Sequence, residues 1–313
     1  MTTSDLILVR ANEAQMEKTW ENHHCEWARG LSVEGYKQRE TTLSKTKFAA
    51  DGFIVWCLVP SSNPTTLDIL SHCESYSRPG IVYEKDTNET RHVTCASICS
   101  VFTPNEHRGK GYCSTMFKLL EQEYRKLGLV FDILYSDIGK YYERFDYLPY
   151  SESEVVLNSS DNCSSENLKN LITPLDREQY IPIFNQIVAN LDSDLVEHVK
   201  NSSSEYGFLL TPTVEALEWH WGRQDIYCKF LNKKVPKVQG FYIQDANSPN
   251  LVLVNHDYTD NSLVVLNYFN KDAEIGAKLF EYLRYYANQV GLEKVKCWNL
   301  DPKGDQFALW QMD

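Results

Sequence analysis

Ser97-Ile-Cys-Ser-Val-Phe-Thr-Pro-Asn-Glu-His-Arg-Gly-Lys-Gly-Tyr-Cys-Ser-Thr-Met116 is the stretch that decides the fold of the first half of this chain. It begins with an apolar, partly β-branched run that is typical of a buried strand, and Pro104 ends that run. A basic glycine turn follows, and apolar residues then recur at helical spacing up to Leu127. A glycine turn at the start of a helix exposes backbone N–H groups at the positive helix end. The stretch therefore predicts strand, turn and helix around a phosphate site.

The residues of the turn exclude two nucleotide motifs. A Walker A turn requires Ser or Thr after its Gly-Lys, whereas a second glycine, Gly111, and then Tyr112 follow Lys110. A Rossmann fingerprint requires a third glycine or an alanine where this chain has Cys113. The remaining pattern is Arg-x-x-Gly-x-small, beginning at Arg108. It resembles the pyrophosphate loop of the GCN5-related N-acetyltransferases (GNAT), which bind acetyl-CoA.

Composition limits the possible classes. The chain has 313 residues, 42% of them hydrophobic, and a net charge of -12. This length suits one large or two ordinary globular domains. The acidity disfavours nucleic-acid or anionic-membrane binding and suits a cationic substrate, although it also simply favours solubility. We expect no signal peptide, because the first residues have neither a basic nor an apolar region, and the sequence has no apolar run of roughly 20 residues. The nine cysteines lack a C-x-x-C pair and indicate free thiols in a reducing, cytoplasmic compartment, with no metal site.

The first half shows the element order β-α-α-β-β-β-α-β-α-β, which is also the order of the GNAT fold. Expected strands cover 6–9, 53–59, 81–83, 92–102, 129–135 and 154–157, and expected helices cover 10–31, 33–47, 112–127 and 136–147. Residues 65–79 are expected to form a long connection. The run Tyr141–Tyr147 resembles the second GNAT signature, with Asp146 at its glycine position.

The second half repeats the coarse order of the first after a polar linker. Its expected elements are helices at 176–191, 213–222 and 275–290, and strands at 226–231, 238–243, 251–256, 263–269 and 294–298. Asp272 and Glu274 stand where the last of these helices begins; they suit helix capping and would repel a pyrophosphate. We therefore expect a mixed α/β protein: an acetyl-CoA-binding catalytic GNAT domain over 1–158, a linker over 159–168, and a degenerate GNAT-like domain over 169–313.

Three further segments carry a closer resemblance. Ser71–Pro79, Ser100–Tyr112 and Leu134–Gly139 are similar to the fungal lysine N-acetyltransferase family. That family acetylates free L-lysine in lysine catabolism and has an additional C-terminal domain. Cys113 replaces the usual alanine or glycine of its loop, and a small side chain there still lets the backbone approach a phosphate.

The resemblance implies how acetyl-CoA is held. Backbone N–H groups of the loop would bind the pyrophosphate, and a strand N–H before the loop would pair with the pantetheine arm and polarise the thioester carbonyl. The loop residues are Arg108, Gly109, Lys110, Gly111, Tyr112 and Cys113, and the strand residues are Cys99, Ser100 and Val101. Lys110 either contacts phosphate or lies in solvent.

The resemblance also implies an acid for the departing thiolate. Tyr142 matches the tyrosine that the family uses as general acid, because it follows the first aromatic residue of the second signature. A tyrosine hydroxyl remains protonated at neutral pH and can donate its proton. The alternative is that Tyr142 only packs, as most of the 19 tyrosines must. Tyr141 is expected to be its packing partner.

A proton acceptor is needed because an alkylamine has a pKa of about 10.4 and is almost fully protonated at pH 7. Glu74 is the first candidate, as general base or as an anchor for the ammonium group. Asp137 and the terminal carboxylate of Asp313 are the others. Arg78 is a candidate to hold the carboxylate of an amino acid, or else to pair with Glu74.

Taken together, these residues predict an acetyl-CoA-dependent N-acetyltransferase that acts directly on a small-molecule amine, with the N6-amine of free L-lysine as first choice. Two alternatives stay open: an acetyltransferase for protein or peptide amines, and a non-catalytic acyl-CoA sensor or structural module. We expect no nucleic-acid, membrane or metal partner, and a monomer or homodimer.

Overall fold

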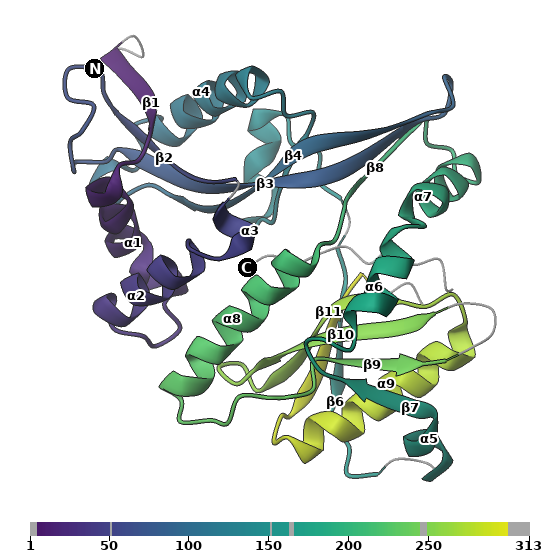
Figure 1. The fold of residues 1–313 in the computed structure, drawn as a ribbon. Helices are drawn as coiled ribbons and strands as arrows, with labels where there is room; N and C mark the ends of the chain where they lie inside the picture. The colour runs from purple at the N-terminus through teal and green to yellow at the C-terminus, as the bar shows by residue number, and fades with distance from the viewer. Residues whose placement is uncertain (1–4, 51, 151, 163–165, 245–248, 300–313) are drawn as a thin grey trace. The chain divides into compact units, whose positions relative to one another are not determined.

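The computed structural model describes residues 5–50, 52–150, 152–162, 166–244 and 249–299. Within them the chain forms two compact units, each with its own mixed sheet and helices (Figure 1). The first unit runs to Pro149 and also takes Leu195–Thr211, whereas the second takes Tyr150–Asp194 and resumes at Pro212. The expected mixed α/β class is confirmed.

The first sheet has the strand order β1-β2-β3-β4-β5, and β8 pairs with the end of β3. Its neighbouring strands are antiparallel except for β4 and β5. The strands are β1 (Leu6–Arg10), β2 (Phe53–Pro60), β3 (Ser71–Glu84), β4 (Glu89–Phe102), β5 (Asp132–Leu134) and β8 (Tyr206–Leu210). The helices are α1 (Glu13–Trp27), α2 (Val33–Leu43), α3 (Lys47–Ala50), α4 (Tyr112–Lys126) and the 3₁₀ helices η2 (Asn105–His107) and η3 (Gly139–Phe145).

Helices cover both faces of this sheet: α1 and α2 lie on one face and α4 on the other (Figure 1). The apolar stripe of α4, including Met116 and Leu120, packs on Trp56 and Ile98 in a buried core. On the opposite face, alternate residues of β2 such as Cys57 are buried beside α1. This alternation is the period-2 pattern of a strand that is covered on both sides.

Strand β3 corrects the predicted long connection over 65–79. Its first residues pair with β2 and its last residues pair with β8. The side chains of His72, Glu74 and Arg78 are buried, although their residue types are usually exposed. The prediction was wrong because it depended on apolar alternation, and this strand buries polar residues instead.

Two strands differ from what the predicted division into halves implies. Strand β8 was not predicted, and it joins the first sheet. The predicted closing strand 154–157 of the first half is β6 (Glu154–Asn158), and it belongs to the second sheet because it pairs with β12 (Lys294–Trp298). The division into a domain over 1–158, a linker over 159–168 and a domain over 169–313 stays a prediction.

The second sheet has the order β6-β12-β11-β10-β9-β7. Buried residues of α9, Leu279, Leu283 and Ala287 among them, form the core of this unit with β10 and β11. Its other strands are β7 (Ile172–Leu175), β9 (Gly240–Ile243), β10 (Asn250–Asp257) and β11 (Ser262–Phe269). Its helices are α5 (Glu166–Leu171), α6 (Ile181–Val188), α8 (Val214–Phe230) and α9 (Ala273–Gln289), and α7 (Leu191–Lys200) crosses from this unit into the first.

Helix α8 corrects the predicted strand over 226–231. It begins at the N-cap Thr213, whose side chain accepts a hydrogen bond from the backbone of Ala216 at 3.2 Å. Its buried residues include Leu217, Trp221 and Tyr227, and they lie on several sides of the helix. A helix that is buried on several sides shows no single apolar stripe, so its last two turns resembled a strand.

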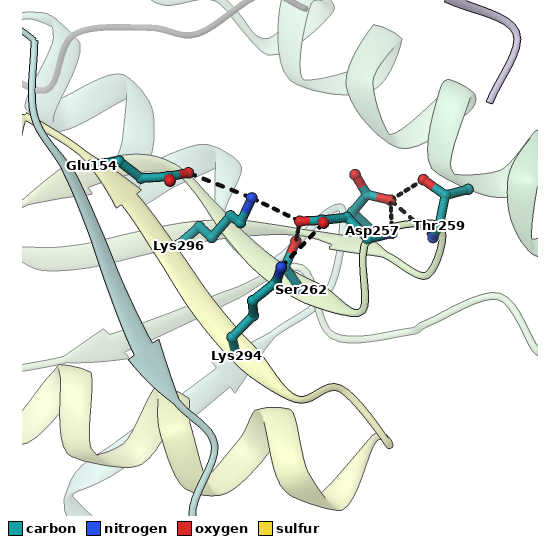
Figure 2. Close-up of polar contacts among 7 residues, drawn as sticks. Glu154, Asp257, Thr259, Ser262, Lys294 and Lys296 are labelled. Atoms are coloured by element: carbon teal, nitrogen blue, oxygen red, sulfur yellow. Dashed lines mark hydrogen bonds and ion pairs between the residues drawn. The ribbon is translucent and has the colours of Figure 1, made fainter.

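Ion pairs and hydrogen bonds connect β6 to its neighbour β12 and connect β12 to the turn before β11. Lys296 of β12 forms an ion pair with Glu154 at 3.5 Å and another with Asp260 at 2.8 Å (Figure 2). Asp260 also accepts from Lys294 at 3.1 Å and from Ser262 at 3.1 Å. Burial opposes its charge, but these bonds lower the pKa of Asp260 to about 2. The turn between β10 and β11 is thus tied to β12, and β12 to β6.

Candidate active site

The predicted phosphate turn lies between β4 and α4. Gly109 and Gly111 have φ values of 75° and 78°, in the left-handed region that glycine enters without steric cost. Gly111 is the N-cap of α4, and among the described residues no side chain caps this helix. The first N–H groups of α4 are therefore left for an external acceptor at the positive end of the helix.

Two exposed cations belong to this turn. Arg108 donates from Nε to the backbone oxygen of Thr103 at 2.9 Å, and its guanidinium lies 5.5 Å from the centre of the Phe102 ring. These contacts hold the stem of Arg108 while the residue as a whole stays exposed, as Lys110 does. An anion at the start of α4 would meet both a helix end and positive charge.

The first residues of α4 are held from both sides. The ring of Tyr112 contacts that of His107 edge-on at 5.9 Å, and His107 Nε2 lies 2.8 Å from Asp68 Oδ1. Cys113 is half-buried, and its thiol is hydrogen-bonded to the Tyr141 hydroxyl. The small residue of the loop thus links the phosphate turn to η3.

The segment predicted to hold the thioester contains a β-bulge. Cys99 pairs with Glu74 and Phe102 pairs with His72, so β4 has one residue more than β3 between these pairs. Ser100 lies in the bulge with φ at 51°, a value that is uncommon outside glycine. Bulges of this kind turn side chains and backbone N–H groups away from the regular ladder.

Strand β4 leaves β5 at the same place. The parallel pairing of these strands covers Ala96–Ile98 and ends next to the bulge. Cys99–Val101 follow the last paired residue, Ile98, and their backbone groups are not part of the β4–β5 ladder. This edge is the backbone surface on which the predicted pantetheine pairing depends.

Glu74 lies directly across from the bulge, in β3 and not in a loop as predicted. The residue is only 4% exposed. Trp20 of α1 donates from Nε1 to its Oε1 at 3.0 Å, and Ser100 donates from Oγ to its Oε2 at 2.7 Å. The Cys99 thiol lies 4.0 Å from the same Oε2. The carboxylate is thus fixed between helix α1 and the bulge.

The surroundings of Glu74 raise its pKa toward neutral pH. Burial raises the pKa of Glu74 to about 7, and the charge of Glu40 adds to this rise. Hydrogen bonds from Ser100 and Trp20 and the charge of Arg39 lower the pKa, but burial outweighs them. A carboxylate with a pKa near 7 both takes up and releases a proton at neutral pH.

Sequence reasoning missed the side chains of α1 and α2 around this carboxylate. Arg39 and Glu40 are adjacent on α2, both buried, and they form an ion pair. Trp20 is 54 positions from Glu74 in the sequence. No spacing rule joins residues so far apart, and Trp20 appeared only as an apolar position of a helix. The adjacent opposite charges at 39 and 40 were the one local signal.

A buried histidine pair lies on the same face of the sheet. The rings of His23 and His72 are 5.3 Å apart, and both residues are completely buried. Burial lowers the pKa of each, for His72 to about 3. Both are therefore neutral at pH 7 and do not change the charge around Glu74.

Tyr142 lies in η3 with 8% of its surface exposed. Its ring packs against Phe117 of α4, with ring centres 5.5 Å apart, and meets Tyr141 edge-on at 5.2 Å. Burial, followed by the nearby Cys113 thiol, raises the pKa of Tyr142 well above its usual value. The ring packs, as the alternative for this residue expected, and its hydroxyl also remains a proton donor at neutral pH.

The other predicted substrate residues have different surroundings. Arg78 lies on β3 and is 1% exposed, with its guanidinium 5.1 Å from the Phe48 ring centre, and burial lowers the pKa of Arg78 to about 10. Asp137 is exposed, and its charge contributes to the raised pKa of Tyr142. Asp313 lies outside the described residues. The roles of these three stay predictions.

In the second unit, the helix start that corresponds to the turn before α4 is the start of α9, and a side chain caps it. Asp272 is the N-cap of α9, and its Oδ1 accepts from the backbone N–H groups of Glu274 at 2.8 Å and Ile275 at 3.0 Å. The predicted capping is therefore confirmed. A phosphate at this helix end would meet a carboxylate in place of free N–H groups.

Two family models match the chain. The model described as Acetyltransferase (GNAT) domain matches residues 83–149, and the model described as LYC1 GNAT-like C-terminal domain matches residues 155–308. The chain belongs to the GNAT superfamily of acetyltransferases. The expected N-acetyltransferase class and the GNAT-like second half are confirmed, and acetyl transfer by members of this superfamily uses acetyl-CoA.

Relatives and solved structures agree with this family. The GNAT chain is 26% identical to a lysine acetyltransferase of Yarrowia lipolytica over 286 residues, 78% of this chain and 70% of the relative. A probable N-acyltransferase from Enterococcus faecalis shares the fold with a TM-score of 0.57 and 9% identity, and a GCN5-related N-acetyltransferase from Anabaena variabilis shares it with 0.56 and 12%. This chain covers 94% of its own length in both comparisons, but only 65% and 66% of those two chains. No helix among the described residues has the length and apolarity needed to span a membrane.

Proposed function

We propose that this GNAT protein transfers acetyl from acetyl-CoA directly to the N6-amine of free L-lysine, a reaction of lysine catabolism. The observation that carries the proposal is the buried Glu74 carboxylate, with its pKa near 7, across from the bulge of β4. The name of the Yarrowia lipolytica relative, a lysine acetyltransferase, supports the choice of acceptor. The proposed partners are a small amine and acetyl-CoA, without nucleic acid or membrane, for a cytoplasmic monomer or homodimer.

Acetyl-CoA would be held by the backbone of the turn and the bulge. Its pyrophosphate would accept hydrogen bonds from the uncapped start of α4, with Arg108 and Lys110 beside it. The thioester would lie at Cys99–Val101, where β4 has left β5. A backbone N–H there would donate to the carbonyl oxygen, which becomes negative when the amine attacks.

Glu74 would act as the general base. The N6-ammonium has a pKa of about 10.4, so only about one molecule in two thousand is neutral at pH 7. The Glu74 carboxylate would take the proton, and the neutral nitrogen would then attack the thioester carbon. The acidic surroundings also favour a cationic substrate, because among the described residues the charges that act on Glu74 include Glu40 beside the cation Arg39, which is itself paired with Glu40.

Tyr142 would assist the departure of CoA. The tetrahedral intermediate collapses when its carbon–sulfur bond breaks, and the sulfur leaves as a thiolate. A tyrosine with a raised pKa remains protonated throughout the neutral range and donates toward that sulfur. The Cys113 thiol at the start of α4 is among the groups that raise this pKa, so the proposed acid would lie close to the proposed CoA loop.

The test is release of CoA thiol with a panel of acceptors, followed by mass spectrometry of the product. We expect turnover with L-lysine and a product acetylated at N6. L-Norleucine is the matched control, because it keeps the α-amine and the chain but lacks the N6-amine. Faster turnover with a lysine-containing peptide would replace the small-molecule acceptor by a protein acceptor. CoA binding without turnover on any amine would refute the enzymatic proposal.

A further inference from the structure

Glu74 is too well covered to meet a substrate amine on its own. Its residue is 4% exposed, and each of its carboxylate oxygens already accepts a hydrogen bond. On its own strand, the preceding residue Cys73 is completely buried. A proton that reaches this carboxylate must therefore pass through one of the groups that are bonded to it.

Within the part of the chain that the structure describes, three side chains are hydrogen-bonded to the carboxylate, and they differ in chemistry. Trp20 has only an N–H donor and cannot accept a proton from an amine, and it is 3% exposed. The Cys99 thiol is a weak donor and acceptor at 4.0 Å. Ser100 makes the shortest contact, 2.7 Å, is half-buried, and carries a hydroxyl that both donates and accepts.

We infer that the Ser100 hydroxyl carries the proton from the acceptor amine to Oε2 of Glu74, an inference that rests on the proposed function. In this step the Ser100 oxygen takes a proton from the substrate ammonium and gives its own proton to the carboxylate. The products are a neutral amine, an intact serine and a carboxylic acid. After the product leaves, Glu74 returns the proton to water through the same hydroxyl.

The backbone of Ser100 supports this role. Its φ of 51° is strained for a residue with a side chain, by about 1 kcal/mol relative to glycine. Yet a serine stands at this position of the bulge, where glycine would fit more easily. The hydrogen bond to Glu74 gives the strained conformation a use, because it aims the hydroxyl at the buried carboxylate.

The titratable groups that act on Glu74 from α2 and β2 do not replace Ser100. Arg39 and Glu40 on α2 act on the Glu74 charge through space. Cys57 of β2 is fully buried, and burial raises its pKa to about 12, so it remains a thiol. Of the two half-buried side chains in contact with Oε2 of Glu74, Ser100 at 2.7 Å makes a shorter contact than Cys99 at 4.0 Å.

The experiment compares Ser100→Gly and Ser100→Ala in the full chain, with L-lysine as acceptor. Both variants lack the hydroxyl, so we expect both to lose about 100-fold in kcat with acetyl-CoA affinity changed less than twofold. Only Ser100→Ala keeps the backbone strain, so the glycine variant should be thermally more stable than the alanine variant. Ser97→Ala is the matched control on the same strand, and its kcat should match the wild type. Equal kcat in Ser100→Gly and wild type would overturn the relay.

A second measurement separates a relay from a structural role. Turnover of methoxyamine, an amine that is neutral at pH 7, needs no proton removal before attack. We expect the loss in Ser100→Gly to be at least tenfold smaller with methoxyamine than with L-lysine. Equal losses with both acceptors would overturn the relay but leave the proposed function intact. A wild-type protein that is inactive on every amine would overturn both.

Discussion

Two segments of this chain, β4 to α4 and β11 to α9, have the same backbone plan and different chemistry. In each, a strand carries a bulge, leaves its parallel neighbour next to that bulge, and leads into a helix. In β11 the extra residue is Leu266, because Val265 pairs with Val254 and Asn267 with Leu253. Parallel pairing of β11 with β12 covers Ser262–Val264. The geometry of an acyl-binding strand is therefore present twice.

What differs is the set of side chains placed on that plan. Across from the β4 bulge lies Glu74, which is buried, charged and hydrogen-bonded. Across from the β11 bulge lie Leu253 and Val254, which are buried and apolar. The start of α4 is an uncapped glycine, whereas the start of α9 is closed by Asp272. The two segments thus share a backbone plan but differ in a free helix end and a buried carboxyl group, and we propose that these two features make the first unit the catalytic one.

The largest expected effect is loss of the base that distinguishes the first bulge from the second. Glu74→Gln keeps the shape and the acceptor oxygen but cannot take a proton. We expect kcat with L-lysine to fall by about 1000-fold, within the range for general bases. Steady-state kinetics on Glu74→Gln and the exposed control Glu34→Gln measure this. Activity of Glu74→Gln within a few-fold of wild type would assign the base to another residue.

The second largest expected effect, on affinity for acetyl-CoA, comes from placing an aspartate at the N-cap of α4, as in α9. Gly111→Asp places a carboxylate at the helix end that would hold pyrophosphate, and we expect affinity for acetyl-CoA to fall about 100-fold. Gly111→Ala is the control for the left-handed backbone, since it adds strain without charge. Calorimetric titration with CoA measures both. If alanine and aspartate lower the affinity equally, backbone shape and not charge controls the site.

Glu74 also predicts how stability depends on pH. Its pKa is about 7 in the folded chain and about 4.3 in an unfolded one, so the ionised form destabilises the fold. The penalty is absent below about pH 4, grows as the pH rises to about 7, and is then constant. Glu74→Gln should therefore be more stable than wild type by about 4 kcal/mol at pH 8 and equal to it at pH 4. Urea unfolding at both pH values tests this, and a less stable variant at pH 8 would contradict it.

Tyr142 offers a smaller effect. Tyr142→Phe removes the hydroxyl and keeps the ring that packs on Phe117. We expect kcat to fall about 10-fold with unchanged affinity for acetyl-CoA, because the ring contact remains while the proton donor is lost. Tyr141→Phe is the matched neighbour and should change kcat less. Unchanged turnover in Tyr142→Phe would leave this residue with packing alone.

The smallest effect concerns the closed helix start of the second unit. Asp272→Ala removes two hydrogen bonds to the first turn of α9 and should destabilise the chain by about 1 kcal/mol. It should not create a second CoA site, because the apolar residues across from the β11 bulge remain. Thermal unfolding together with the stoichiometry of CoA binding measures both. Two bound CoA molecules per chain would show that the cap alone had closed this unit.

The strand–turn–helix of the first half could be predicted because its signals are local. A β-branched run, paired glycines and a helical stripe lie next to one another from Ser97 to Leu127. The same holds for Asp272, whose capping role depends on residues within three positions. Strand β3 and the end of α8 could not be predicted, because their burial departs from the usual patterns of apolar residues.

The sheets to which β6 and β8 belong also could not be predicted from the sequence. The residues of β6 and β8 do not indicate which strand each pairs with, because strands pair through backbone atoms that all residues share. Their assignment depends on which sheet edge the chain reaches.

By itself, the sequence determined the family, the phosphate turn and the candidate acid Tyr142, because each is written in residues that are neighbours along the chain. Only the tertiary structure decided that Glu74 lies in a buried strand, across from Ser100 and beneath Trp20. A carboxyl group becomes a base for neutral pH through the loss of water and through the charges around it. Those surroundings come from helices and strands far apart in the sequence, so composition and residue spacing could not predict them.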